Sequence, residues 1–147
     1  MIKAIEHFSF TVSGLEGSLD FFCNKLGLEA TPIEEVDHPD VKQIVGMPDA
    51  RLRISLVKLP GDQTIELIQY IQPKGRPLDL TTSNTGVAHI AFEVSDIVTL
   101  YNNLSSQGIT FLSPPVWTRS NDVREQWGVC YLKGPDNITF ELIEKKE

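Results

Sequence analysis

The first segment of the chain alternates apolar and polar side chains, and helical spacing of apolar side chains follows it. Residues 4–13 alternate along their length, which predicts a strand whose faces differ. The apolar positions that then recur at helical spacing are Leu15, Leu19, Phe22 and Leu26. We expect this helix to begin at Ser13 or Ser18 and to end at Gly27, because serine favours helix starts and glycine favours helix ends.

Three β-rich pieces complete this first pattern: LEATPIEEV, RLRISLVKL and TIELIQY, the last two joined by the turn PGDQ. The second half of the chain has the same order. It begins with the strand AHIAFEV and continues with a helix near 97–107 that ends at Gly108. The pieces that follow are ITFLS, WGVCYLK, the turn GPDN and ITFELIE. The expected order is therefore βαβββ, twice.

The two halves also match residue by residue, which indicates an internal repeat. An offset of 82 aligns His7 with His89, and an offset of 75 aligns Glu66 with Glu141. The helix ends match only after a slip of one residue. We interpret the chain as a single domain of two homologous modules, about 1–72 and 86–147, with the linker 73–85 between them. The excess of strands over helices predicts an α+β fold with a curved sheet.

Strand alternation puts four chemically active side chains on the face away from the helices. On the first strands the expected core residues are Phe8, Phe10, Val12 and Phe92. His7, Glu66, His89 and Glu141 then all point to the other face. Each alone is more commonly structural or solvated, but the matched pairs favour a site. If the modules pack as pseudo-twofold partners, two imidazoles and two carboxylates suit one divalent ion such as Zn, Ni, Co, Mn or Fe.

The charge and composition of the chain argue against some classes of binding partner. The 147 residues carry a formal net charge of −7 and a sequence pI near 4.9, which argues against a nucleic acid partner. No apolar run approaches the roughly 20 residues that cross a bilayer, and the N-terminal residues do not resemble a signal peptide. Cys23 and Cys130 are isolated thiols, so we expect a cytoplasmic protein that has no membrane partner.

The segments GVAHIAFEVSDI and GPDNITFELIE resemble the second module of the vicinal oxygen chelate superfamily. This group holds glyoxalase I, methylmalonyl-CoA epimerase, extradiol dioxygenases, and fosfomycin and bleomycin resistance proteins. The resemblance implies paired βαβββ modules that form a U-shaped curved sheet around a metal-binding cleft. It also implies that the metal ligands are His7, Glu66, His89 and Glu141.

This ligand set is similar to that of glyoxalase I, whereas the epimerase typically has Gln in place of Glu66. The resemblance implies a lyase or isomerase of lactoylglutathione lyase or acyl-CoA epimerase type, which moves a proton next to a metal-chelated carbonyl through an enediolate. Glu141 would be the base and Glu66 its counterpart. Two alternatives stay open: a non-catalytic small-molecule binding or resistance protein, and an extradiol-type Fe(II) dioxygenase, for which His38 is a poor acid–base.

The expected partner is a small molecule with vicinal oxygens or an acyl thioester. Apolar side chains expected to line the cleft are Ile68, Tyr70, Trp117 and Trp127. Lys74 and Arg76 could clamp an anion, and Glu34 and Glu35 could reach the pocket, although a solvated role is more common for such residues. Related proteins are commonly dimers, so we expect a homodimer. The metal site could lie inside one chain or across two.

Overall fold

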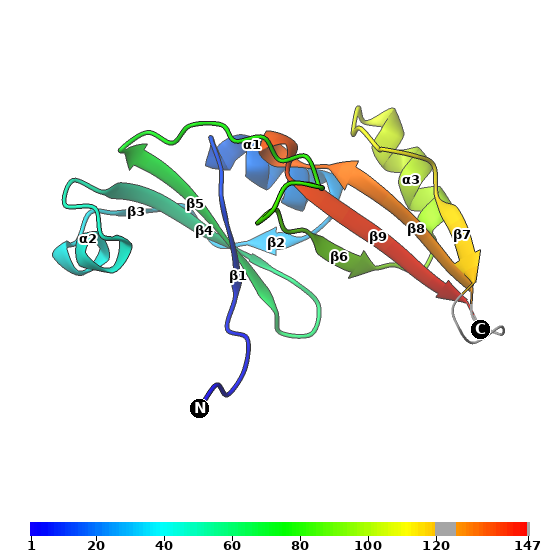
Figure 1. Ribbon diagram of the computed structural model, residues 1–147, viewed down its shortest axis with the longest axis horizontal. Coiled ribbons are helices and arrows are strands. Elements are labelled where there is room, and N and C mark those ends of the chain that lie inside the picture. The colour runs from blue at the N-terminus through cyan, green and yellow to red at the C-terminus, as the bar shows by residue number, and fades with distance from the viewer. Residues whose placement is uncertain (120–125, 147) are drawn as a thin grey trace. The chain divides into compact units, whose positions relative to one another are not determined.

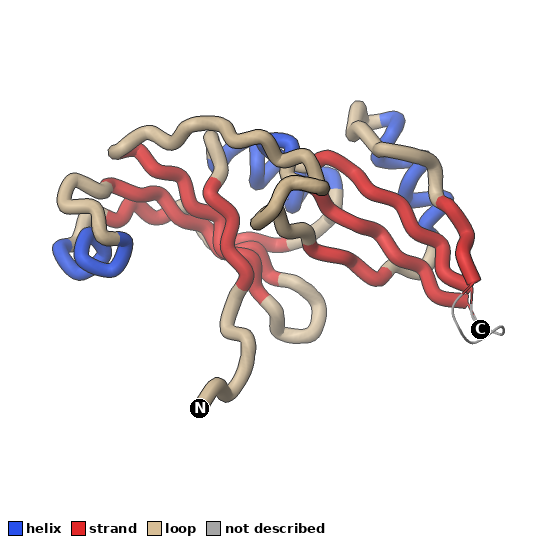
Figure 2. The backbone as a smooth tube through the Cα atoms, in the orientation of Figure 1, coloured by secondary structure: helices blue, strands red, loops and turns tan. Residues whose placement is uncertain are grey.

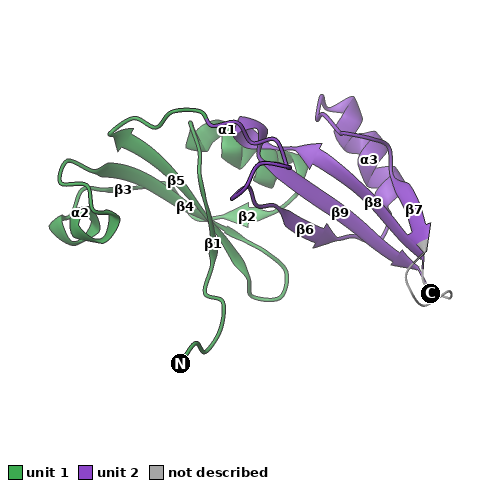
Figure 3. Cartoon of the chain, in the orientation of Figure 1, with its two compact units in different colours: residues 1–77 green, residues 78–147 purple. Residues whose placement is uncertain are grey.

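The computed structural model describes residues 1–119 and 126–146, which form two compact units, Met1–Pro77 and Leu78–Glu147 (Figure 3). The boundary falls inside the predicted linker. Each unit contains a curved, unclosed sheet and at least one helix, so the predicted α+β class is confirmed. That the two units act as one domain around a single cleft stays a prediction. Among the described residues, no helix combines the length and apolarity needed to cross a membrane.

The sheet of the first unit has five strands in the order β1-β5-β4-β2, with β3 also paired to β4 (Figure 1). The strands are β1 (Phe8–Thr11), β2 (Glu29–Ala30), β3 (Glu34–Val36), β4 (Arg51–Lys58) and β5 (Thr64–Gln72). The helices are α1 (Leu15–Leu19), the π-helix η1 (Asp20–Lys25) and α2 (Pro39–Val45). The first and last strands, β1 and β5, run parallel, while β4 and β5 form an antiparallel hairpin.

The second unit repeats this arrangement with four strands in the order β6-β9-β8-β7 (Figure 2). The strands are β6 (Ile90–Glu93), β7 (Val116–Arg119), β8 (Gln126–Lys133) and β9 (Thr139–Lys146). The helices are α3 (Ile97–Ser106) and the short 3₁₀ helix η2 (Pro135–Asn137). Again the first and last strands, β6 and β9, run parallel, and β8 and β9 form a hairpin. The predicted turns PGDQ and GPDN join the two hairpins.

The last strand of each unit shows which face of its sheet is covered. In β5, Ile65 and Leu67 are fully buried, and Gln69, in the same phase, hydrogen-bonds to the start of α1. In β9, Phe140 and Leu142 are buried in the same way on the side of α3. The predicted core phase of both strands is confirmed. The alternate positions of each strand therefore point away from its helix.

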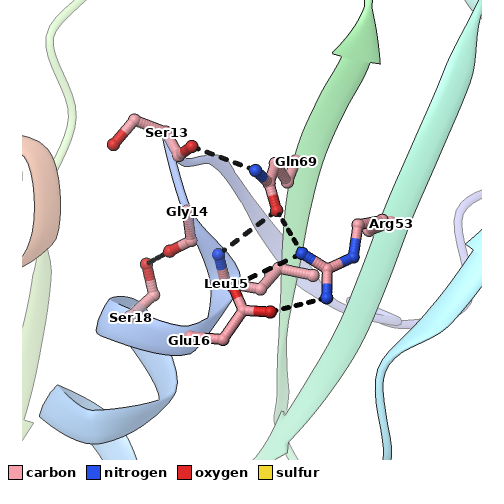
Figure 4. A network of polar contacts seen from close by, with 7 residues as sticks. All are labelled: Ser13, Gly14, Leu15, Glu16, Ser18, Arg53 and Gln69. Atoms are coloured by element: carbon pink, nitrogen blue, oxygen red, sulfur yellow. Dashed lines mark hydrogen bonds and ion pairs between the residues drawn. The ribbon is translucent and has the colours of Figure 1, made fainter.

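A side chain from the last strand holds the start of each helix, at matching positions of the repeat. The Gln69 side-chain oxygen accepts from the Leu15 backbone N–H at 3.4 Å, and it also accepts from Arg53 (Figure 4). In the second unit the buried Glu144 carboxylate accepts from the Ile97 backbone N–H at 2.9 Å. Helix N-termini leave backbone N–H groups without intrahelical partners, so these contacts anchor each helix to its sheet. Glu144 makes this contact with a carboxylate, and the helix dipole favours negative charge at a helix N-terminus.

The helix of the first unit contains one residue more than that of the second, and the extra residue is accommodated by η1. Leu26 N–H bonds to the Phe21 carbonyl at 3.1 Å, five residues back rather than four. A π-turn takes up one additional residue without ending the helix. The slip of one residue between Gly27 and Gly108 in the repeat is thus a π-helix in the structure.

Some boundaries differ from prediction. The first helix begins neither at Ser13 nor at Ser18, because Gly14 is its N-cap and Ser18 lies within α1. Residues 109–113 were predicted as a strand, but only Phe111 makes an isolated bridge, to Leu132, and the strand of this region is β7. Prolines at 114 and 115 follow this segment and disfavour continuous strand pairing there.

Burial on the first strands is weaker than predicted. Val12 is buried, but Phe10 and Phe92 are only half-buried and Phe8 is 36% exposed. Phe8 pairs with the start of β5, whereas α1 begins beyond the other end of β1, so the helix does not cover it. The helix α2, whose N-cap is His38, was not predicted from the sequence.

Deleting Asn24 from η1 should convert the π-turn into regular helix, because the first module then matches the spacing of the second. We expect the urea midpoint to change little. Deleting Asn102 from α3 should cost about 2–5 kcal/mol, because the buried Leu104 would rotate out of the core. Urea unfolding followed by circular dichroism measures both. Equal loss of stability in the two deletion variants would contradict this account of η1.

Candidate metal centre

The first unit brings His7 and Glu66 together at the predicted face. His7 directly precedes β1, and Glu66 on β5 pairs with Ser9, two residues after the histidine. The distance from His7 Nε2 to Glu66 Oε2 is 3.4 Å, with side chains 40% and 20% exposed. The other ring nitrogen, Nδ1, donates to the Glu6 carboxylate. A carboxylate on one imidazole nitrogen directs the other toward a ligand position.

Glu6 also changes the acid–base behaviour of this histidine. Its hydrogen bond raises the pKa of His7 above the ordinary value, partial burial opposes this, and the Glu66 charge raises the pKa further. Protonation therefore competes for His7 at a higher pH than for an isolated histidine. A ligand role requires the neutral ring.

The second unit repeats this arrangement with His89 and Glu141. His89 directly precedes β6, and Glu141 on β9 pairs with Ala91, again two residues after the histidine. His89 Nε2 lies 3.0 Å from Glu141 Oε2, with side chains 38% and 15% exposed. The parallel register between first and last strand thus produces the same pair twice.

Both pairs have separations that adjacent ligands of one ion would have. Two donor atoms at about 2.1 Å from an ion lie about 3.0 Å apart at a right angle and about 3.4 Å apart at a tetrahedral angle. The two observed separations, 3.0 and 3.4 Å, fit this range. Each unit brings one histidine and one glutamate together, and within the described part of the chain no three His, Cys, Asp or Glu side chains form one cluster.

The neighbouring hairpin strand distinguishes the two pairs. On β4 the residue opposite Glu66 is Leu56, whereas on β8 the residue opposite Glu141 is Tyr131. The Tyr131 hydroxyl lies 3.5 Å from His89 Nε2, and the two rings are 5.1 Å apart. Tyr131 was not among the site residues predicted from the sequence. The turn GPDN could have identified this residue from the sequence, because a hairpin centred there pairs position 131 with position 141.

Cys130, the residue before Tyr131, points to the helix side instead. It is buried beside Leu142, and burial, with the Glu141 charge as a smaller cause, raises the pKa of its thiol to about 11. A thiol of this kind stays protonated and is a poor metal ligand.

The apolar residues predicted to line the cleft divide between the two faces. Ile68 and Tyr70 lie on β5 in the phase of Glu66, and Trp127 lies on β8 in the phase of Tyr131. Trp117 does not share this face. Its ring lies over Gly128, where an added Cβ would be 3.0 Å from the indole, and this is the helix side of the sheet.

The remaining candidates lie on other elements of the first unit. Glu34 pairs with Ile54 and so shares the face of Glu66, whereas Glu35 pairs with Arg53 on the α1 side. Lys74 and Arg76 are exposed beyond the end of β5. His38 is exposed, and its ring accepts from the Asp40 backbone N–H at 3.3 Å, which is a helix-capping role.

Comparison with known proteins shows the family to which the chain belongs. A family model described as the glyoxalase/bleomycin resistance protein/dioxygenase superfamily matches residues 4–142. The chain belongs to this superfamily. Among curated proteins, a 2-epi-5-epi-valiolone epimerase from Actinomyces sp is 25% identical over 145 residues, covering 95% of this chain and 78% of that protein.

Solved structures share the fold at low identity. A glyoxalase family protein from Bacillus cereus aligns with a TM-score of 0.87 at 21% identity, covering 100% of this chain and 97% of that one. The trypanothione-dependent glyoxalase I of Leishmania major aligns with a TM-score of 0.65 at 16% identity, covering 97% and 87%. These likenesses confirm the predicted fold, and the family model confirms the predicted superfamily.

Proposed function

We propose that the two His–Glu pairs together bind one divalent transition metal and that the protein is a metal-dependent epimerase or isomerase. The observation that carries this proposal is the repeated pair, one from each module, with the same strand register and with separations that suit ligands of one ion. Two neutral imidazoles and two carboxylates balance a dication, which favours its burial. Glyoxalase superfamily members typically bind a metal.

The chemistry follows from the two carboxylates. When bound, a divalent ion supplies a Lewis acid that polarises a substrate carbonyl and makes the adjacent C–H bond more acidic. Glu141 takes that proton as general base. Glu66, from the other module, is the counterpart: it takes a proton from solvent and returns it to carbon, and Glu141 then releases the abstracted proton to solvent. Delivery to the opposite face of the same carbon gives epimerisation, and delivery to the neighbouring carbon gives isomerisation.

The choice of reaction is supported by the relative named as an epimerase, whose named substrate is the first compound to test. Hemithioacetals, 2-substituted malonyl thioesters and catechols are the further substrate classes for the screen. We also propose that the protein is a cytoplasmic homodimer. Free Cys23 and Cys130 thiols support the cytoplasmic location, because such thiols persist in a reducing compartment.

Elemental analysis tests the metal proposal. Protein reconstituted with Co²⁺, Ni²⁺ or Zn²⁺ should hold about one ion per chain, because one ion needs both pairs. His7→Ala and Glu141→Ala should each lose the ion or bind it much more weakly, since each removes one of four ligands. The matched control is His38→Asn, which removes the third imidazole but keeps a good N-cap residue and should retain the ion. Native protein that cannot be reconstituted would contradict the metal proposal.

Glu141→Gln tests the proton-transfer role, because it removes the base but keeps an oxygen ligand. We expect metal retention together with a loss of turnover of about 10²–10⁴-fold. Incorporation of solvent deuterium next to the substrate carbonyl, followed by NMR, measures the step directly. The control variant is Glu93→Gln, which alters an exposed carboxylate paired with Lys145. It should incorporate deuterium into the substrate at the native rate. Unchanged exchange in Glu141→Gln with metal bound would remove Glu141 as the base.

A further inference from the structure

The two histidines of the proposed site make their hydrogen bonds to carboxylates through opposite ring nitrogens. In the first unit, His7 Nδ1 donates to the Glu6 carboxylate, while Nε2 lies 3.4 Å from Glu66. In the second unit, the hydrogen-bonded nitrogen of His89 is Nε2, which lies 3.0 Å from Glu141. The two His–Glu pairs match in strand register, so this difference comes from side chains and not from the backbone.

The residue before each histidine accounts for the difference. Glu6 precedes His7, and the offset of 82 that relates the two modules places Ala88 before His89. The methyl side chain of Ala88 offers no acceptor, so it cannot repeat the Glu6 contact. The Glu6 side chain is 88% exposed and adjacent in sequence to its partner, so this contact does not depend on packing between elements.

These contacts determine which nitrogen holds the hydrogen of a neutral ring. An ionised carboxylate only accepts, so the nitrogen that it contacts most closely carries the hydrogen. For His7 the contact of Nδ1 with Glu6 is the closer of the two, which leaves the lone pair of Nε2 free to bind an ion. His89 carries its hydrogen on Nε2, and that hydrogen must move to Nδ1 before Nε2 can bind an ion.

We propose that Glu6 is a positioning residue that presets His7 as a metal ligand, a role that the second module lacks; this inference rests on the proposed function. The Glu6 carboxylate holds the hydrogen on Nδ1 and keeps Nε2 on the side of Glu66. An ion on Nε2 withdraws charge from the ring, which polarises the Nδ1–H bond and strengthens its hydrogen bond to the carboxylate. Loss of this contact therefore weakens the ligand and not the fold.

Glu6→Ala tests the proposal, because it removes the carboxylate next to His7 and changes no buried side chain. The probe is Co²⁺, and competition with a chelator at about pH 8, where few rings are protonated, measures its dissociation constant. We expect binding about tenfold weaker than native, at the lower end of the range for such partners, because Glu6 is exposed. Glu6→Gln keeps an acceptor oxygen without the charge and should lose less. Ala88→Glu supplies a carboxylate next to His89 and should tighten Co²⁺ binding.

A spectroscopic readout separates positioning from a general effect on stability. Pulsed electron paramagnetic resonance of Cu²⁺-loaded protein reports the quadrupole coupling of the imidazole nitrogen remote from the ion. This coupling falls when a hydrogen bond polarises the N–H bond of that nitrogen. Glu6→Ala should therefore raise the coupling of one remote nitrogen and leave that of the other unchanged.

The matched control is Asp49→Asn, which removes one exposed carboxylate of the first unit, between α2 and β4. It should change neither the Co²⁺ affinity nor the spectrum. Native Co²⁺ affinity in Glu6→Ala, or an unshifted spectrum, would overturn the inference and leave the metal proposal standing.

Two other results would overturn the inference as well. An equal loss of affinity in Asp49→Asn would show an effect of net charge, and a loss in Glu6→Ala as large as that in His7→Ala would show that Glu6 is itself a ligand. Native protein that binds no Co²⁺ would overturn the proposed function and this inference together.

Discussion

The parallel pairing of the first and last strands of each module is the constraint on which the rest of the structure depends. It places Glu66 opposite Ser9 and Glu141 opposite Ala91, so that in both units a histidine two residues upstream shares a face with a glutamate. The period of two in β5 and β9 then separates two tasks along one strand. One phase is buried against the helix and supplies the stability, and the other carries the carboxylate. A shift of register by one residue would exchange the two phases and place the carboxylate in the core.

The same last strands also anchor the helices. Gln69 and Glu144 occupy equivalent positions and accept from the first helical N–H groups, so each strand determines both where its helix starts and which face stays open. The modules have diverged around this shared contact. In the first unit, Arg53 bonds to both Glu16 and Gln69, whereas in the second unit Gly128 stands at the matching position and the Trp117 ring covers it. The extra residue of the first helix is confined to η1, away from the anchoring contact and from the His–Glu pair.

Much of this could be predicted from the sequence, because alternation and internal repetition are local signals. The strand phases of Ile65, Leu67, Phe140 and Leu142 and the pairing of each histidine with a glutamate followed from the period of two. Exposure of Phe8 could not be predicted, since it depends on how far α1 extends over the sheet. Trp117 was placed on the wrong face because the strand β7 lies further along the chain than expected. Tyr131 was missed because its partner is set by hairpin register and not by a motif.

In the proposed site one ion receives a histidine from each module. Pulsed electron paramagnetic resonance of Cu²⁺-loaded protein counts the coordinated imidazoles directly, and Cu²⁺ is the divalent ion of the first transition row that such sites bind most tightly. Two imidazoles per ion are expected in the native protein and one in His7→Ala or in His89→Ala. A single imidazole in the native protein, or two ions per chain with one imidazole each, would show that the pairs act separately and would contradict the account.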